Sequence, residues 1–133
     1  MAKGSYYERA VREHIRDKGR DAEGLKKSGT QDEGDISHRA GPFHFILEAK
    51  NKQRMDLASA VDQAVVEAAN YRAHRRDRVA TIPAAVVKRP RKGVGQSYVV
   101  LELDEFLELT RWVEDAYAVS RVPPSRGATT NGD

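Results

Sequence analysis

The chain contains no cysteine among its 133 residues. Disulfide bonds, thiolate zinc sites and cysteine nucleophiles are therefore excluded together. It also has no apolar run near the ~20 residues that span a bilayer. Residues 1–5 are not followed by the apolar stretch of a signal peptide. These absences predict a cytoplasmic protein with no membrane partner.

Apolar residues make up 39% and charged residues 32% of the chain, which is typical of one globular domain. We expect that domain to cover residues 1–120. Residues 121–133 contain proline, glycine, serine and threonine with little to bury, so they are predicted to form a disordered tail.

Charge is distributed unevenly along the chain, whose net charge is +3. Between residues 71 and 92 there are eight basic residues and one acid, Asp77; between residues 102 and 115 there are six acids and one base, Arg111. Such a pair of blocks can steer a polyanion to one face of the protein. The alternative is two ordinary solvated faces. The eight basic residues are Arg72, Arg75, Arg76, Arg78, Lys88, Arg89, Arg91 and Lys92.

Hydrophobic periodicity and turn signals predict alternating helices and strands. Ser5 and Glu8 have the spacing of a capping box at the start of the first helix, Asp56 and Asp104 are expected to cap the two later helices, and Pro83 indicates an edge or a bulge. The apolar side chains of the last helix are expected to pack inside: Phe106, Leu107, Leu109, Trp112 and Val113. The expected helices cover 6–18, 57–76 and 105–118, and the expected strands 24–28, 35–39, 43–50, 79–88 and 97–103. This order predicts an α/β fold with a mixed sheet flanked by helices.

The strand expected at 43–50 ends in two charged residues, Glu48 and Lys50. Because side chains alternate along a strand, both project from the same face. If strands 35–39 and 43–50 pair as a hairpin, Asp35 lies opposite Glu48. Two converging carboxylates repel unless a cation lies between them, and Mg²⁺ is commonly held by one or two carboxylates with waters and a phosphate. Lys50 then lies where charge develops during metal-assisted phosphodiester hydrolysis. The alternative is that Asp35 is a turn residue and that Glu48 and Lys50 form an edge salt bridge.

In this context, Asp35 followed by Glu48-Ala49-Lys50 resembles the signature of the PD-(D/E)xK nuclease superfamily. Within it, the chain is similar to the archaeal-type Holliday junction resolvases, including those carried by phages. The resemblance runs from about residue 4 to residue 109 and implies a restriction-endonuclease-like fold. Residue 34 is glycine, where the superfamily signature has proline. The matching segments are Gly4–Arg9, Asp17–Gly19, Ser28-Gly29, Gly34–Ile36, Ile46–Lys50, Gln63-Ala64 and Tyr98–Val100.

The resemblance also implies a role for each site residue. Asp35 and Glu48 would be the principal metal ligands, the Ala49 carbonyl a third, and Lys50 the catalytic lysine. Glu8 would complete the metal site, although a capping box alone also accounts for it. Two further residues would serve catalysis: Ser28 on a loop near the substrate, and Gln63 facing the site from the second helix. Alternatively, Ser28 belongs to a simple turn and Gln63 to the helix surface.

The resolvase family implies Mg²⁺ as cofactor, with Mn²⁺ able to substitute, and no nucleotide cofactor. It further implies a homodimer that cuts opposite strands of a four-way DNA junction, in the cytoplasm of the host cell if the protein is phage-encoded. Two alternatives remain open: another structure-selective or restriction-like nuclease of the superfamily, or a non-catalytic DNA-binding accessory protein of recombination. Phosphate contacts are expected from nine basic residues, namely Lys3, Arg9, Lys26, Lys27, Lys52, Arg54, Arg72, Arg75 and Arg76.

Overall fold

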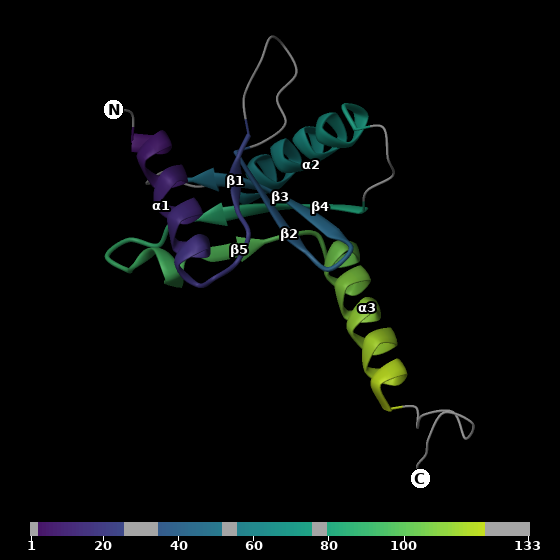
Figure 1. Cartoon of the computed structure of the whole chain (residues 1–133). Helices are drawn as coiled ribbons and strands as arrows, with labels where there is room; N and C mark the ends of the chain where they lie inside the picture. Colours follow the sequence, from purple (N-terminus) through teal and green to yellow (C-terminus); the bar gives the residue numbers. More distant parts are fainter. Residues whose placement is uncertain (1–2, 26–34, 52–55, 76–79, 122–133) are drawn as a thin grey trace, which may run out of the picture. The chain divides into compact units, whose positions relative to one another are not determined.

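The computed structural model describes residues 3–25, 35–51, 56–75 and 80–121, whose path is drawn in Figure 1. By contacts between its residues the chain divides into two units, Met1–Glu102 and Leu103–Asp133. The predicted α/β class with a mixed sheet is confirmed. The elements are α1 (Lys3–Asp17), β1 (Glu23–Gly24), β2 (Ile36–Ala40), β3 (Phe43–Lys50), α2 (Leu57–Ala73), β4 (Ala80–Val87), the 3₁₀ turn η1 (Val94–Gln96), β5 (Tyr98–Val100) and α3 (Leu103–Arg121).

The first unit is built on a five-stranded sheet in the order β1-β2-β3-β4-β5. β3 pairs antiparallel with β2 and parallel with β4, and β4 pairs antiparallel with β5. The parallel pair is in register over its whole length, from Phe43 opposite Ala80 to Lys50 opposite Val87. Because the two strands run in the same direction, β3 and β4 end at the same edge of the sheet, and α2 is the crossover connection between them.

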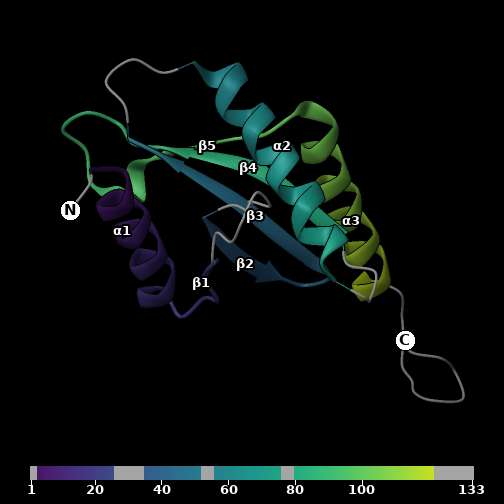
Figure 2. The same cartoon turned by 90° about the horizontal axis from the view of Figure 1, so that it is seen from above.

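Two helices of this unit cover opposite faces of the sheet (Figure 2). On one face, Tyr7 and Val11 of α1 pack against Leu47 of β3. On the other face, Ala68 and Tyr71 of α2 pack against Ile46. Successive residues of β3 therefore belong to different cores, as the alternation along a strand requires.

The predicted boundaries agree best for β3 and α2. The strand expected at 97–103 is shorter, since β5 ends at Val100 and Leu103 begins α3, and β1 begins at Glu23 instead of residue 24. β3 covers the predicted range, and Asp56 caps α2 as expected, accepting a hydrogen bond from the Ser59 N–H at 3.2 Å. α1 begins at Lys3, so Ser5 lies in its first turn instead of at the N-cap position. Asp104 likewise lies inside the first turn of α3 and does not precede it. Of the predicted tail, 121–133, Arg121 is the last residue of α3, and residues 122–133 lie outside the described ranges.

Pro83 lies in β4, a strand with neighbours on both sides, so the prediction of an edge is right only in part. β5 pairs with Ala85–Val87 alone, whereas β3 pairs with all of β4. Among the described strands, the half of β4 that contains Pro83 is therefore paired on one side only. A residue without an N–H fits there because no ladder bond is required of it on the open side.

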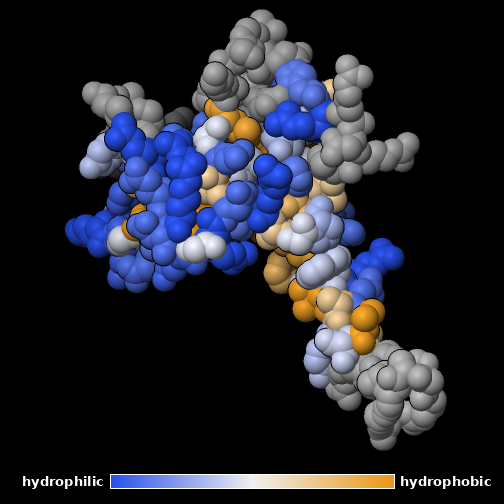
Figure 3. Space-filling model, viewed as in Figure 1, coloured by the Kyte–Doolittle hydropathy of each residue, from blue (hydrophilic) through white to orange (hydrophobic). Residues whose placement is uncertain are grey.

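The apolar side chains of α3 are not buried as predicted. Phe106 is 50%, Trp112 44% and Val113 59% exposed, and Figure 3 shows apolar side chains along the surface of this helix. The prediction was wrong because periodicity identifies an amphipathic helix but does not say what covers its apolar face.

Candidate active site

The end of β3 brings a carboxylate and an ammonium to the face of the sheet that α2 covers. Leu47 and Ala49 point into the core beneath α1, so Glu48 and Lys50 point the other way. Both make hydrogen bonds with a side chain of α2, described below. The predicted sharing of one face by Glu48 and Lys50 is confirmed.

Asp35 lies beside this strand end. The register of the hairpin ends with Ile36 opposite Leu47, and Asp35 is the next residue outward from Ile36. The Asp35 N–H donates to the Leu47 carbonyl at 3.2 Å, and the Asp35 carboxylate accepts a hydrogen bond from the Ala49 N–H at 2.9 Å. These two hydrogen bonds place Asp35 at the end of β3, with its carboxylate against the backbone between Glu48 and Lys50.

Gln63 of α2 connects the charged groups. Its Oε1 accepts a hydrogen bond from Lys50 Nζ at 2.8 Å, and its Nε2 donates to Glu48 Oε2 at 2.9 Å. The same Nε2 donates to Glu67 Oε2 at 3.0 Å. One amide therefore fixes the positions of an ammonium and two carboxylates, and its orientation is determined because only Nε2 can donate.

Glu67 was missed by the sequence analysis. It is 2% exposed and lies one turn after Gln63 on α2. The signal that would have found it is its place within the apolar stripe of the helix, between Ala64 and Ala68. A carboxylate at a buried position needs a hydrogen-bond donor, and a donor four residues earlier on the same helix face is within reach.

The site carries more buried negative charge than buried positive charge. Glu48 is 3% and Glu67 2% exposed, and Lys50 Nζ, at 3.1 Å from Glu48 Oε2, is the ammonium paired with Glu48. The second oxygen of Glu48, Oε1, has no hydrogen-bond partner among the described residues. A buried carboxylate oxygen without a donor is costly, and a bound cation would satisfy it. The donor set of Asp35 and Glu48 fits Mg²⁺, which takes one or two carboxylates and completes its shell with water and phosphate.

Glu8 is not grouped with these carboxylates. It lies on α1, where it forms an ion pair with Arg12 one turn later. Over the described ranges, no three His, Cys, Asp or Glu side chains are close enough together to hold a metal ion. The metal-binding role implied for Glu8 stays a prediction, as does that of the Ala49 carbonyl.

The remaining predicted site residues are exposed, partly buried or without a described side chain. Arg9 and Arg72 are exposed. The Arg75 guanidinium lies 3.6 Å from the centre of the Tyr71 ring and makes a cation–π contact with it. The side chain of Lys3 is not described. Five basic residues and the serine lie outside the described ranges: Lys26, Lys27, Ser28, Lys52, Arg54 and Arg76.

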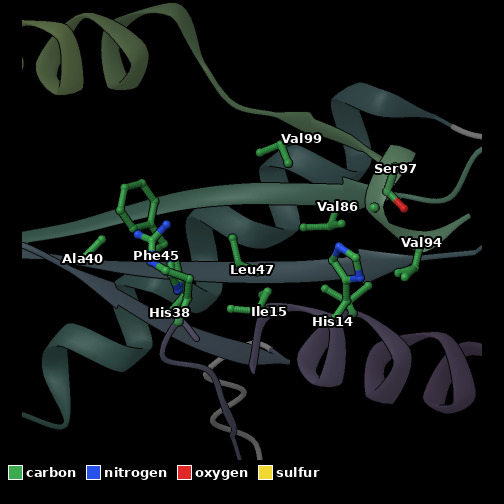
Figure 4. Close-up of a pocket in the computed structure, with 13 residues that line it drawn as sticks. His14, Ile15, His38, Ala40, Phe45, Leu47, Val86, Val94, Ser97 and Val99 are labelled. Carbon is green, nitrogen blue, oxygen red and sulfur yellow. The ribbon is translucent and has the colours of Figure 1, made fainter. Parts of the chain in front are cut away.

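A pocket of about 420 Å³ lies on the opposite face of the sheet, between α1 and the strands (Figure 4). Its walls are largely apolar, with Ile15, Leu47 and Val86 among them, and no carboxylate lines it. It is therefore separate from the polar site beneath α2, and the ionisable side chains in its lining are His14, Arg20 and His38.

Neither the models of known protein families nor the curated proteins give a match to this chain. Among the described helices, none combines the length and the apolar character needed to cross a membrane. A function must therefore be inferred from the arrangement of Asp35, Glu48, Lys50 and Gln63.

Proposed function

We propose that this protein is a Mg²⁺-dependent endonuclease that hydrolyses phosphodiester bonds in branched DNA. The observation that carries the proposal is the gathering of Asp35, Glu48 and Lys50 at the end of β3, together with a buried oxygen on Glu48 to which no described residue donates a hydrogen bond. The resemblance of Glu48-Ala49-Lys50 and its context to the PD-(D/E)xK signature supports the same conclusion.

Each residue has a defined task in this proposal. Asp35 and Glu48 would hold the metal ion, which when bound polarises the phosphate and assists ionisation of the attacking water. Lys50 provides a positive charge near the phosphorus, where negative charge grows as water attacks and one P–O ester bond breaks. Gln63 positions Lys50 and Glu48 through its two hydrogen bonds, so that neither side chain has to reorganise during the reaction.

The substrate class follows from the resemblance to junction resolvases. A homodimer presents two sites related by a two-fold axis, which matches the pseudo-two-fold symmetry of a four-way junction. Paired cuts in opposite strands would then resolve the junction. The positive net charge of +3 supports an anionic partner.

The test is a cleavage assay on a labelled four-way junction, with and without Mg²⁺. The wild-type protein should cut only with the metal, whereas Lys50→Ala and Asp35→Asn should lose cutting by at least about a hundredfold while still binding the junction. Arg39→Gln, a change at the exposed far end of the hairpin, is the matched control and should cut normally. Normal cutting by either site variant would overturn the mechanism.

The same assay separates the alternatives. Linear, flap and single-stranded DNA are tested in parallel with the junction. Preferential cutting of one of these substrates would identify a different nuclease of the superfamily. A protein that binds the junction but nicks no substrate with either Mg²⁺ or Mn²⁺ would be a non-catalytic accessory factor.

A further inference from the structure

Five consecutive residues after β4, Lys88 to Lys92, carry four positive charges and no negative charge. We call this segment the basic turn. It begins directly beside the candidate active site, because β3 and β4 are parallel and end at the same edge. Lys50 is opposite Val87, the last residue of β4, and the Lys88 N–H donates to the Lys50 carbonyl at 3.0 Å. The first cation of the turn is therefore attached to the backbone of the proposed catalytic lysine.

The backbone of the basic turn holds an arginine in a conformation that suits glycine. A hydrogen bond of 3.3 Å from the Lys92 N–H to the Arg89 carbonyl closes the turn around Pro90 and Arg91. Arg91 has φ of 61°, and it is the single non-glycine residue with positive φ in the described part of the chain. The third position of such a turn normally takes glycine or asparagine. A charged side chain kept there against backbone preference indicates a use for that charge.

The side chains of the turn are available to an anionic ligand. Arg91 and Lys92 are exposed, and neither has an ion-pair partner among the described residues. The Arg89 guanidinium lies 4.9 Å from the centre of the Tyr98 ring of β5, which limits its freedom without neutralising it. The segment that follows the turn is attached to α1 by a hydrogen bond of 2.7 Å from the Tyr7 hydroxyl to Ser97 Oγ. The cations are thus presented from a restrained loop.

We propose that Arg89, Arg91 and Lys92 bind backbone phosphates of the DNA strand that passes through the active site. The proposal rests on the proposed function for the identity of the polyanion and adds a binding subsite to it. Phosphates that flank the cleaved bond must lie near the edge where Lys50 ends, and the basic turn is a cluster of cations that the described residues place at that edge. Lysine and arginine contacts to phosphates position a strand without reading its sequence, which suits a substrate recognised by shape.

The first experiment measures DNA binding without metal, so that cleavage does not interfere. The variant Arg89→Gln/Arg91→Gly/Lys92→Gln is compared with Arg20→Gln/Arg39→Gln/Arg111→Gln, which removes the same number of positive charges from exposed positions elsewhere. Fluorescence anisotropy with a labelled junction is recorded over a salt series. The turn variant should bind at least about tenfold more weakly, and the slope of log affinity against log salt should fall by about two to three. The control variant should stay within about threefold of the wild type.

Arg91→Gly gives a second, more selective test. Glycine accepts positive φ without strain, so the melting temperature should be unchanged or higher while the junction is bound several-fold more weakly. A merely structural role for Arg91 predicts unchanged binding, and that result would overturn the proposal. Equal binding by the turn and control variants would also overturn it.

Failure of this proposal is distinguishable from failure of the proposed reaction. If the turn variant loses binding and the wild type never cuts DNA, the phosphate subsite stands and the nuclease does not. If the wild type cuts junctions and the turn variant binds and cuts like the control, the nuclease stands and the subsite does not.

Discussion

The ammonium nitrogen of Lys50 lies 3.1 Å from Oε2 of Glu48. The two side chains are two residues apart on β3, and the amide of Gln63 on α2 bonds to both. Hydrogen bonds of the Gln63 amide thus connect the end of β3 to α2. Local stability and the geometry needed for chemistry therefore depend on the same hydrogen bonds.

Replacing Gln63 with leucine should lower the free energy of unfolding by about 1–3 kcal/mol, because Glu48 and Glu67 lose a shared donor in a buried position. Urea unfolding at neutral pH measures the change. Gln96→Leu, at an exposed position in η1, should change the stability by less than about 0.5 kcal/mol. Equal stability of the two variants would contradict the importance of the Gln63 network.

Mg²⁺ should stabilise the folded protein if Asp35 and Glu48 bind it. A ligand that binds only the native state at ten times its dissociation constant adds about 1.4 kcal/mol to the free energy of unfolding. Thermal melts in Mg²⁺ and in EDTA measure this difference. Asp35→Asn keeps an oxygen that can accept from the Ala49 N–H, so it should fold but lose the response to Mg²⁺. A response as large as that of the wild type would remove Asp35 from the metal site.

Asp56→Ala should destabilise the protein by about 0.5–2 kcal/mol, because it removes the side chain that accepts from the Ser59 N–H at the start of α2. Asp62→Ala is the matched control on the same helix, exposed and beyond the first turn. It should cost less than about 0.5 kcal/mol. Chemical denaturation compares the two, and an equal loss would mean that the cap contributes nothing.

Tyr7 should make the stability depend on alkaline pH. Burial raises the pKa of its hydroxyl from the ordinary value of 10.0, against a smaller opposing effect of Ser97. Because the folded pKa is the higher one, the stabilisation is complete below pH 10 and is lost as the pH rises through the raised value.

Tyr7→Phe should therefore be less stable than the wild type near neutral pH by about 0.5–1.5 kcal/mol, through loss of the bond to Ser97. This difference should shrink as the pH rises above about 10. Tyr6→Phe, which changes a residue that is 68% exposed, should show no such convergence. Parallel curves for Tyr7→Phe and the wild type would refute the predicted linkage.

The sequence predicted the central hairpin well, for physical reasons. Aromatic and β-branched residues in 43–50 favour a strand, and the Gly41-Pro42 turn before it favours a hairpin with the preceding strand. These local signals were sufficient to predict that Asp35 lies near the end of β3, where its carboxylate accepts from the Ala49 N–H.

Features that depend on tertiary packing were not predicted. Glu67 stands within the apolar stripe of α2, but its sharing of the Gln63 amide with Glu48 appears only when α2 is laid against β3. The exposed apolar face of α3 is a second example, since a helix with the same pattern can be covered or open. The basic turn was recognised as charge, but its position next to Lys50 follows from the parallel pairing of two strands separated by a whole helix.

Pro83 has a consequence for solubility. A half-strand that is paired on one side only among the described strands is a template on which a foreign strand can extend the sheet, and such extension begins many aggregates. Pro83 cannot donate a hydrogen bond to an incoming strand, so it interrupts any new ladder at that point. Replacing Pro83 with valine would keep a side chain suited to a strand and restore the donor, and the variant should self-associate more readily on concentration.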